Sequence, residues 1–265
     1  MIRDLHESDR QAILDYSYQR EMENMFVIGS FNRPKTFELN RFIGIEEDGK
    51  LMGLATVFLN YASFVVHAAE RSVIDQLVDA VMDRGLKFNT VPAFRRYAEP
   101  MIERLRSKYH LEPQKITEET VFILPKGKFS LVESEAIIAS EEDRENCARL
   151  ELNGPLDVLT QQQLQNVHPQ ETTVIHSDGK VVSKAHIHAL SRHYAQIGGV
   201  ITLPAYRRKG LGRQCVSALC AHCFALGVES VILFTADTNI PAQGLYKSLG
   251  FEPVDAFVIA EYPSP

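Results

Sequence analysis

The sequence predicts an α/β protein made of two similar domains, each with helices packed on a mixed sheet. Three observations support this prediction. The chain has 265 residues, of which 45% are hydrophobic, which is enough for two ordinary cores. Its second half alternates between runs with strand periodicity and runs with helix periodicity. Two short motifs also recur in the same order in both halves.

The clearer recurring motif is an Asp-Gly pair between two apolar runs. It occurs as Asp48-Gly49 in the first half and as Asp178-Gly179 in the second. An Asp-Gly pair in this setting is a strong signal for a β-hairpin. We therefore expect one such hairpin in each half of the chain.

The other recurring motif is an acidic segment that opens a helix, at 7–10 and again at 141–144. Ser8 and Ser140 are the N-cap candidates of these two helices, since a serine side chain accepts a bond from an unpaired N–H group of the first turn. Both motifs repeat at an offset of about 130 residues, which indicates two copies of one domain type.

We place the boundary between the copies near 126–137, which gives domains at 1–130 and 131–265. In the second domain the predicted elements alternate as a helix at about 140–166, a hairpin at 171–190, a strand at 195–203, a helix at 211–227, a strand at 229–236, a short helix at 240–249 and a strand at 254–262. The region of the first half that we match to the turn at 207–213, roughly 72–90, has one glycine, Gly85, and no basic cluster.

The most informative segment is a basic turn that contains two glycines and lies between the strand ending near 203 and the helix beginning near 211. Gly210 and Gly212 allow a ligand to approach the backbone closely. A helix N-terminus carries unpaired N–H groups and partial positive charge. Four cations surround the glycines: Arg207, Arg208, Lys209 and Arg213. This pattern favours an anion site, best suited to a pyrophosphate, over a tight turn whose basic residues merely face solvent.

Composition excludes several classes of protein. A net charge of −6 argues against a general nucleic-acid binder. No run reaches the roughly 18 apolar residues of a membrane span. The charged start of the chain, Met1-Ile2-Arg3-Asp4, lacks the apolar core of a signal peptide. We expect a cytoplasmic protein without nucleic-acid or membrane partners.

The cysteines favour core packing over metal binding. Three of the four, Cys215, Cys220 and Cys223, recur on the apolar stripe of the helix that follows the glycine turn, and the fourth is Cys147. A second pair of ligands at zinc-like spacing is missing. We therefore expect no metal site.

The order of strand, basic glycine turn, helix, strand and short helix resembles the GNAT superfamily of acyl-CoA-dependent N-acyltransferases. The family signature Arg/Gln-x-x-Gly-x-Gly/Ala is matched by Arg207, Gly210 and Gly212. Further on, Asn239 and the segment 245–251, which reads Leu-Tyr-Lys-Ser-Leu-Gly-Phe, are similar to the family's second signature. The resemblance covers about 137–262, and the first half looks like a copy that has lost its coenzyme turn.

The resemblance implies tandem GNAT-like domains, each with a twisted, mostly antiparallel sheet, and acetyl-CoA as co-substrate. The backbone of Val200, Ile201 and Thr202 would hold the pantetheine arm. Asn239 would contact the same arm, although an ordinary N-cap explains an asparagine there equally well. The backbone amides that would hold the pyrophosphate belong to Arg208, Lys209, Gly210, Leu211, Gly212 and Arg213.

Tyr246 is the candidate catalytic residue. Acyl transfer from a thioester expels a thiolate, and a positioned phenol can protonate it. A tyrosine at the edge of the core, with a hydrogen-bonded hydroxyl, is the structural alternative. The general base stays open among His186, His188, His193 and a chain of waters. Family members that acetylate protein N-termini carry a glutamate five residues before the asparagine, where this chain has Phe234.

We therefore expect a GNAT-type N-acetyltransferase that moves an acetyl group to a primary amine of a small molecule or peptide by direct attack in a ternary complex. The alternative is a non-catalytic acyl-CoA-binding sensor or partner-recruiting module. A P-loop nucleotidase is excluded because no Gly-Lys-Ser/Thr follows the turn. A homodimer is compatible with the sequence.

Overall fold

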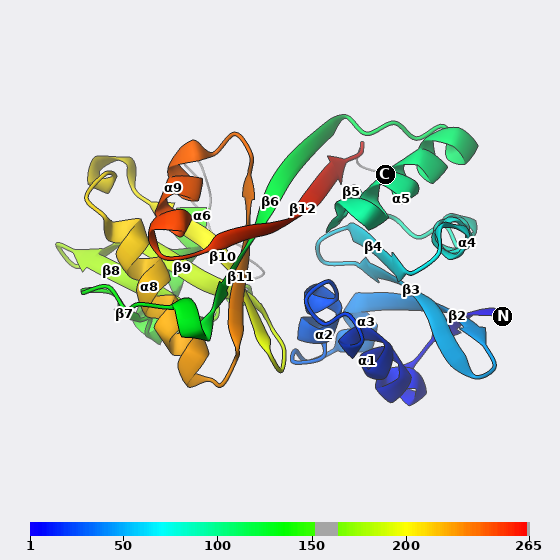
Figure 1. Cartoon of the computed structure of the whole chain (residues 1–265), viewed down its shortest axis with the longest axis horizontal. Helices are drawn as coiled ribbons and strands as arrows, with labels where there is room; N and C mark the ends of the chain where they lie inside the picture. The colour runs from blue at the N-terminus through cyan, green and yellow to red at the C-terminus, as the bar shows by residue number, and fades with distance from the viewer. Residues whose placement is uncertain (152–163, 264–265) are drawn as a thin grey trace. The chain divides into compact units, whose positions relative to one another are not determined.

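The computed structural model describes residues 1–151 and 164–263, which form two compact, discontinuous units (Figure 1). Unit 1 consists of Met1–Val121, Phe234–Thr238 and Val254–Pro265. Unit 2 consists of Phe122–Leu233 and Asn239–Pro253. The sequence places one boundary at 130/131, whereas the compact units divide three strands between them. The reason is that these strands are long and each contributes one end to each unit.

Unit 1 is a sheet in the order β1-β2-β3-β4-β5-β12-β6. Its recorded pairs are antiparallel except β4 with β5, which are parallel and meet only at Ser63↔Thr90. The elements are β1 (Ile2–Leu5), η1 (Glu7–Asp9), α1 (Arg10–Tyr18), α2 (Met25–Ser30), α3 (Thr36–Leu39), β2 (Asn40–Glu47), β3 (Lys50–Phe58), β4 (Ser63–Ala68), α4 (Arg71–Asp83), β5 (Thr90–Phe94), α5 (Arg95–Tyr109), β6 (Lys115–Pro125) and β12 (Glu252–Glu261).

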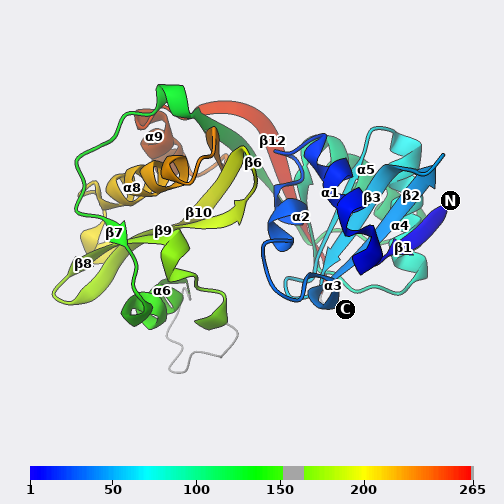
Figure 2. The ribbon, with the colours of Figure 1, turned by 90° about the horizontal axis from the view of Figure 1, so that it is seen from below.

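The sheet of unit 1 is covered on both faces because its strand side chains alternate between two cores. On β3, Ala55 and Val57 belong to the core under α4 and α5. Leu54 and Phe58 of the same strand belong to the core that includes Ile13 of α1. Figure 2 shows these helices as separate layers on β3 and its neighbours.

Unit 2 repeats this architecture in the order β7-β8-β9-β10-β11-β6. Again one recorded pair is parallel, β10 with β11, and the others are antiparallel. The elements are η2 (Lys126–Lys128), β7 (Ile137–Ile138), η3 (Glu141–Asp143), α6 (Arg144–Glu151), η4 (Pro169–Glu171), β8 (Thr172–Ser177), β9 (Lys180–Leu190), β10 (Tyr194–Thr202), η5 (Pro204–Tyr206), α8 (Leu211–Ala225), β11 (Ser230–Ala236) and α9 (Ile240–Ser248).

Two helices cover opposite faces of the sheet in unit 2. On β9, Ala185 and Ile187 pack into the core of α8. Val181 lies in a smaller core with Cys147 of α6. Figure 2 shows α8 and α6 on opposite sides of β9 and β10. Cys215, Cys220 and Cys223 are fully buried, as predicted. Cys147 is fully buried too, and burial raises the pKa of each of the four thiols.

The predicted internal repeat is present in the backbone. Asp48 and Gly49 both have left-handed φ values, 49° and 74°, and Asp178 and Gly179 have nearly the same values, 50° and 72°. Each hairpin also carries a register shift in its first strand shortly before the turn, at Ile45/Glu46 and at Ile175/His176. The shared bulge is a feature that the residue pattern did not indicate.

The two helix openings also match, with one correction. Ser140 is the N-cap of η3, and the Asp143 carboxylate accepts its backbone N–H at 2.9 Å. In unit 1 the N-cap is His6 rather than Ser8, because the Asp9 carboxylate accepts the His6 N–H at 2.8 Å and the turn begins one residue earlier than Ser8. The part of the predicted helix at 152–163 lies outside the described residues. Among the described helices, none is long and apolar enough to cross a membrane.

Candidate coenzyme and acyl-transfer site

The site in unit 2 begins where β10 leaves β11. Their parallel ladder runs from Tyr194↔Ser230 to Gln196↔Ile232. Beyond that point β10 continues to Thr202, paired with β9 on its other edge through Ile201↔Lys184 and Thr202↔Ser183. One edge of the backbone at 198–202 therefore has no strand partner in the described ladders. An extended ligand can add to this edge as a further strand.

A bulge on β10 marks the same position. The register with β9 shifts between Gly198 and Ile201, and Gly199 has φ +55°. A Cβ atom at Gly198 would lie 2.4 Å from the ring of His188, and one at Gly199 would lie 2.2 Å from the ring of His186. Both glycines are therefore needed for two imidazole rings to lie against the bulge.

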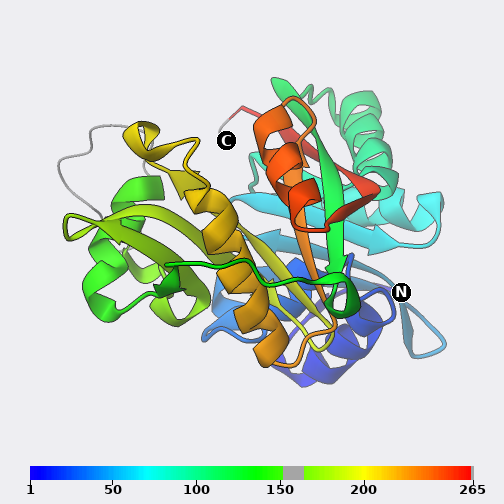
Figure 3. The ribbon, with the colours of Figure 1, turned by 60° about the vertical axis from the view of Figure 1, so that its left-hand side comes forward.

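The connection from β10 to α8 holds the backbone open toward solvent. After η5, Arg208 adopts φ +63° and Gly210, the N-cap of α8, adopts φ +80°. A left-handed arginine is uncommon and marks a locally constrained turn. Because the N-cap is a glycine, it has no side-chain oxygen to accept a hydrogen bond, and the first N–H groups of α8 are left for another acceptor. Figure 3 shows this loop leading into α8.

The four predicted cations surround this helix end without acidic partners. Arg207 Nε donates to the Thr202 carbonyl at 3.0 Å, and Arg213 Nε donates to Ser248 Oγ at 3.1 Å. Lys209 Nζ lies 5.2 Å from the centroid of the Tyr206 ring. Arg208 is exposed. Within the described residues, no salt bridge neutralises any of the four, so the helix end keeps its positive charge.

Gly212 links the turn to the rest of the predicted site. A Cβ atom at this glycine would lie 3.4–3.7 Å from Leu245, Thr202 and Val200, at ordinary contact distance. The first turn of α8 therefore adjoins the end of β10 and one side of α9. The structure brings together Val200, Ile201, Thr202, the segment 207–213 and α9, as the predicted coenzyme site requires.

Asn239 precedes α9, and Tyr246 lies within the helix. Asn239 is the N-cap, and its Oδ1 accepts the Ala242 N–H at 3.3 Å, which is the structural role that the sequence left open. Tyr246 is 6% exposed and lies in the core with α8. Its ring centroid is 6.2 Å from that of Phe122 and 5.9 Å from that of Phe251. The tyrosine is therefore rigidly held, and its placement leaves both a catalytic and a structural role open.

The structure separates the three histidine candidates. His186 and His188 share one face of β9, as predicted, with ring centroids 4.4 Å apart. His193 lies in the turn between β9 and β10, where its carbonyl accepts the Glu229 N–H at 2.8 Å. Two residues that the sequence did not single out join the first pair. Lys184, on the same face of β9 and 1% exposed, forms an ion pair with Glu151 at the end of α6.

The equivalent connection in unit 1 is different. The sequence placed it at roughly 72–90, but the helix that follows the fourth strand begins at Arg71, so Ala69 and Glu70 alone join β4 to α4. Glu70 is the N-cap of α4. The sequence placed this connection too far along the chain, because the real connection is short and lacks the glycine by which it was sought. A carboxylate at this helix end repels an anion.

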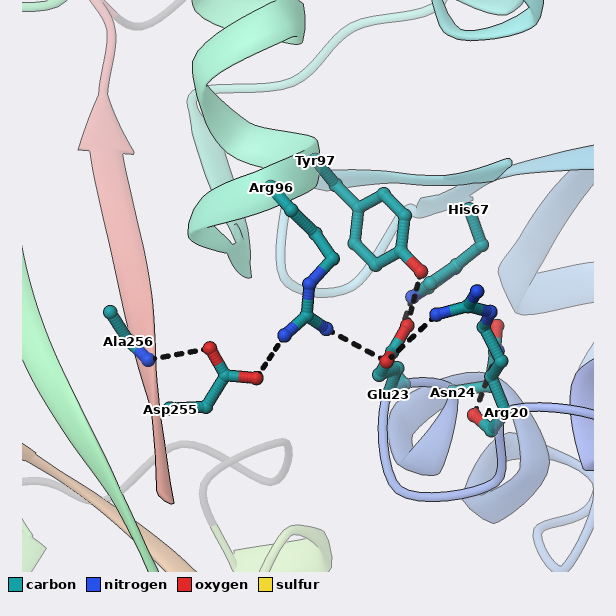
Figure 4. Close-up of polar contacts among 8 residues, drawn as sticks. All are labelled: Arg20, Glu23, Asn24, His67, Arg96, Tyr97, Asp255 and Ala256. Carbon is teal, nitrogen blue, oxygen red and sulfur yellow. Dashed lines mark hydrogen bonds and ion pairs between the residues drawn. The ribbon is translucent and has the colours of Figure 1, made fainter. Parts of the chain in front are cut away.

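Unit 1 instead contains a polar cluster in which opposite charges face one another (Figure 4). Arg96 joins the carboxylates of Glu23, at 2.7 Å, and of Asp255 on β12. Tyr97 donates its hydroxyl proton to Glu23. His67 Nε2 lies 2.9 Å from the Glu23 carbonyl, and full burial lowers the pKa of His67 to about 4, so its ring is neutral. This cluster satisfies its own charges.

Comparison with known proteins finds a family match within the second half of the chain. Residues 138–251 match the model of the Acetyltransferase (GNAT) family. The mycothiol acetyltransferase of Renibacterium salmoninarum is 36% identical to this chain over 81 residues, which are 29% of this chain and 24% of that protein. The chain thus spans about a quarter of the length of this curated relative.

Several solved structures are similar over the whole chain. An X-ray structure of a Drosophila protein superposes with a TM-score of 0.74 at 13% identity, covering 100% of this chain and 99% of that one. A tandem GNAT protein from the clavulanic acid biosynthesis pathway gives 0.62 at 16% identity, with coverage of 100% and 99%. A GNAT-family acetyltransferase from Colwellia psychrerythraea gives 0.61 at 14% identity, with coverage of 99% for both chains. At these identities the likeness concerns the fold, and it confirms the predicted tandem architecture.

Proposed function

Because residues 138–251 form a domain of the GNAT family of acetyltransferases, we propose that this protein transfers the acetyl group of acetyl-CoA to a primary amine of a small molecule or peptide. The observation that carries the proposal is the uncapped, positively charged start of α8 beside the open edge of β10. The cations and helix N–H groups suit the phosphates of the coenzyme, and the open edge suits its pantetheine arm.

In this proposal each part of the coenzyme has its own partners. The backbone N–H groups from Arg208 to Arg213 hold the pyrophosphate. The backbone of Val200, Ile201 and Thr202 pairs with the amides of the pantetheine arm. Asn239 contacts the same arm while it caps α9. The thioester then lies near the bulge of β10, between β10 and β11.

The reaction is a direct displacement within a ternary complex. The lone pair of the acceptor nitrogen attacks the thioester carbonyl carbon, and a C–N bond forms. The C–S bond then breaks, and the sulfur leaves with its electron pair. Tyr246 donates a proton to this thiolate, and the amide nitrogen loses one proton to a base. No metal is needed for these steps.

Calorimetry on the full chain tests the coenzyme site. We expect acetyl-CoA to bind in the micromolar range, and Gly210→Val combined with Gly212→Val to abolish binding. Valine at Gly210, with φ +80°, forces a different turn. Gly179→Val is the matched control, since Gly179 has φ +72° in a hairpin turn outside the site. Equal binding by the double variant and the parent would show that the site is wrong.

A panel of primary amines tests the transfer step. Release of free thiol from acetyl-CoA is followed with spermidine, glucosamine and a tripeptide with a free N-terminus. Acceptor-dependent release supports an enzyme. Binding of acetyl-CoA without release by any primary amine supports the alternative, a non-catalytic acyl-CoA sensor.

A further inference from the structure

We propose that His186 donates a hydrogen bond to the carbonyl oxygen of the thioester and stabilises the negative charge that this oxygen gains when the amine attacks. The inference rests on the proposed acetyl transfer and adds a catalytic residue to it. Three observations carry it: the tautomer that Lys184 imposes on the ring, the neutral state of the ring, and its contact with the bulge of β10.

The first observation is the hydrogen bond between Lys184 and His186. Lys184 Nζ lies 3.4 Å from His186 Nδ1, and because an ammonium group can only donate, Nδ1 is the acceptor. The proton of the neutral ring is therefore on Nε2. Glu151 forms an ion pair with Lys184 and holds the ammonium group in place. No residue in the described part of the chain accepts a hydrogen bond from Nε2, so this N–H group is left for a ligand.

The second observation is that the ring of His186 stays neutral. Its side chain is 20% exposed, and desolvation is the main cause that lowers its pKa well below the ordinary value of 6.5. Electrostatic effects of His188, Lys184 and His168 lower the pKa further. A ring that resists protonation is a poor general base, so His186 leaves the group of candidates for that role. A neutral imidazole still polarises a carbonyl group through its N–H.

The third observation is the position of the ring at the point where β10 separates from β11. A Cβ atom at Gly199 would lie 2.2 Å from Cε1 and 3.2 Å from Nε2 of His186. The ring therefore lies against the backbone of the bulge, and glycine makes this close approach possible. The parallel ladder with β11 ends at Gln196, so the edge of β10 is open here. In the proposed complex the thioester lies at this bulge, beside the ring.

The chemistry of a thioester decides which of its atoms the N–H group acts on. Its carbonyl oxygen is a strong hydrogen-bond acceptor, whereas its sulfur is a weak one. A donor beside the thioester therefore binds the oxygen. This oxygen becomes negatively charged when the amine attacks, so the hydrogen bond is strongest in the transition state.

His186 and Tyr246 then act on different atoms of the thioester from opposite faces of the sheet. His186 is on the face of β9 that α6 covers, since Ala185 and Ile187 point into the core of α8, where Tyr246 lies. The nitrogen lone pair forms the C–N bond, and the π electrons of the carbonyl move to the oxygen. Nε2–H stabilises this oxyanion and keeps its proton. The carbonyl then re-forms, the sulfur leaves with the C–S electron pair and gains the Tyr246 proton, and the nitrogen loses its proton to a base other than His186.

The kinetic test compares two variants of the full-length protein, with the most active amine of the panel. His186→Leu removes the donor and should lower kcat about 100-fold, the usual cost of one oxyanion donor, with the Kd of acetyl-CoA unchanged. His186→Gln keeps an N–H donor and should lower kcat only about 10-fold. Equal losses in both variants would overturn the proposal, because glutamine replaces a donor but cannot replace a base. His222→Leu, on α8, is the control and should leave kcat unchanged.

Infrared spectroscopy of bound acetyl-CoA with carbon-13 in the thioester carbonyl gives an answer that does not depend on finding the acceptor. A hydrogen bond to the oxygen weakens the C=O bond, so the stretching frequency should be lower in the parent than in His186→Leu. Equal frequencies in the two proteins would overturn the donor role. Failure of the parent to bind acetyl-CoA would instead overturn the proposed function, so the two failures are distinguishable.

Nitrogen-15 NMR of histidine-labelled protein tests Lys184 and Glu151 as positioning residues. We expect His186 as the neutral Nε2–H tautomer in the parent, and observation of the Nδ1–H tautomer would overturn the proposal. Lys184→Met combined with Glu151→Met removes the ion pair without leaving an unpaired charge. This double variant should show a mixture of both tautomers, which a purely structural role of the pair would not produce. An unchanged tautomer would show that the pair does not position the ring.

Discussion

The two units share a strand order and hairpins but differ in the connection that follows the fourth strand. In unit 1, Ala69 and Glu70 join β4 to α4, and the carboxylate of Glu70 lies at the helix N-terminus. In unit 2, a longer loop at 203–210 with exposed cations precedes α8. The same fold therefore does not carry the same site. Loop length and the sign of charge at one helix end decide whether an anion is attracted.

The polar groups of the two units differ in the same sense. In unit 1, Glu23, Arg96 and Asp255 neutralise one another around a neutral His67. In unit 2, the cations at the start of α8 have no acidic partner within the described residues. We infer that the charged groups of unit 1 stabilise the fold, whereas the cations at the start of α8 in unit 2 bind a ligand. The predictions that follow test this contrast, from the largest expected effect to the smallest.

Two of the buried tyrosines, Tyr246 and Tyr97, should behave oppositely. Tyr246→Phe removes the proposed proton donor but keeps the ring, so kcat should fall about 100-fold while acetyl-CoA affinity stays within a few-fold. Tyr97→Phe, in unit 1, removes a hydroxyl that is bound to Glu23 and should leave kcat unchanged. Thiol-release assays measure both. Full activity in Tyr246→Phe would show that Tyr246 has a structural role and is not the proton donor.

Mild acid should destabilise unit 1 through His67. Burial lowers its folded-state pKa to about 4, below the usual 6.5, so the unfolded chain binds the proton more readily. The stabilisation is complete above pH 6.5 and is lost as the pH falls to 4, by up to about 3 kcal/mol. Urea unfolding between these pH values measures the loss. His67→Gln keeps a donor for the Glu23 carbonyl and should flatten the dependence; an unchanged slope would contradict this assignment.

Removing cations should weaken coenzyme binding only in unit 2. Arg208→Ala combined with Lys209→Ala should raise the Kd of acetyl-CoA about 10-fold and reduce the salt dependence of binding, since two charge-assisted contacts to phosphate are lost. Arg71→Ala is the matched change, because Arg71 opens α4 and pairs with Asp75 and Glu103. Its Kd should equal that of the parent. Equal weakening by both changes would indicate a general charge effect.

The stoichiometry should be one acetyl-CoA per chain, and it should resist a change of charge in unit 1. Glu70→Gln removes the carboxylate at the start of α4 but does not supply the missing loop or cations. Calorimetry should still give a single site with an unchanged Kd. A second bound coenzyme, in the parent or in this variant, would show that unit 1 retains a site.

Local rules predicted much of unit 2. The glycine turn, α8 and the hairpin at Asp178-Gly179 were predicted closely, because turn chemistry and helix periodicity are encoded in neighbouring residues. The buried cysteines of α8 followed from the same periodicity. The N-cap of η1 was missed because a histidine can take this position when an aspartate three residues later accepts its N–H.

The parts that sequence could not supply depend on contacts between distant segments. The pairing of Lys184 with Glu151 joins a strand to a helix end, and nothing in either local sequence indicates it. The fit of His186 against Gly199 depends on a bulge that shifts the register of two strands. Such features arise from tertiary packing, which periodicity alone does not encode.

The last strand of the chain has a consequence for how the protein is made. β12 pairs with β5, from Phe257↔Phe94 to Glu261↔Thr90, so residues that are synthesised after unit 2 complete the sheet of the first unit. Until then, β5 has an exposed edge that is open to pairing with other chains. The sheet of unit 1 therefore stays incomplete while unit 2 is synthesised. Premature termination anywhere in the second half leaves a first half whose sheet lacks β12.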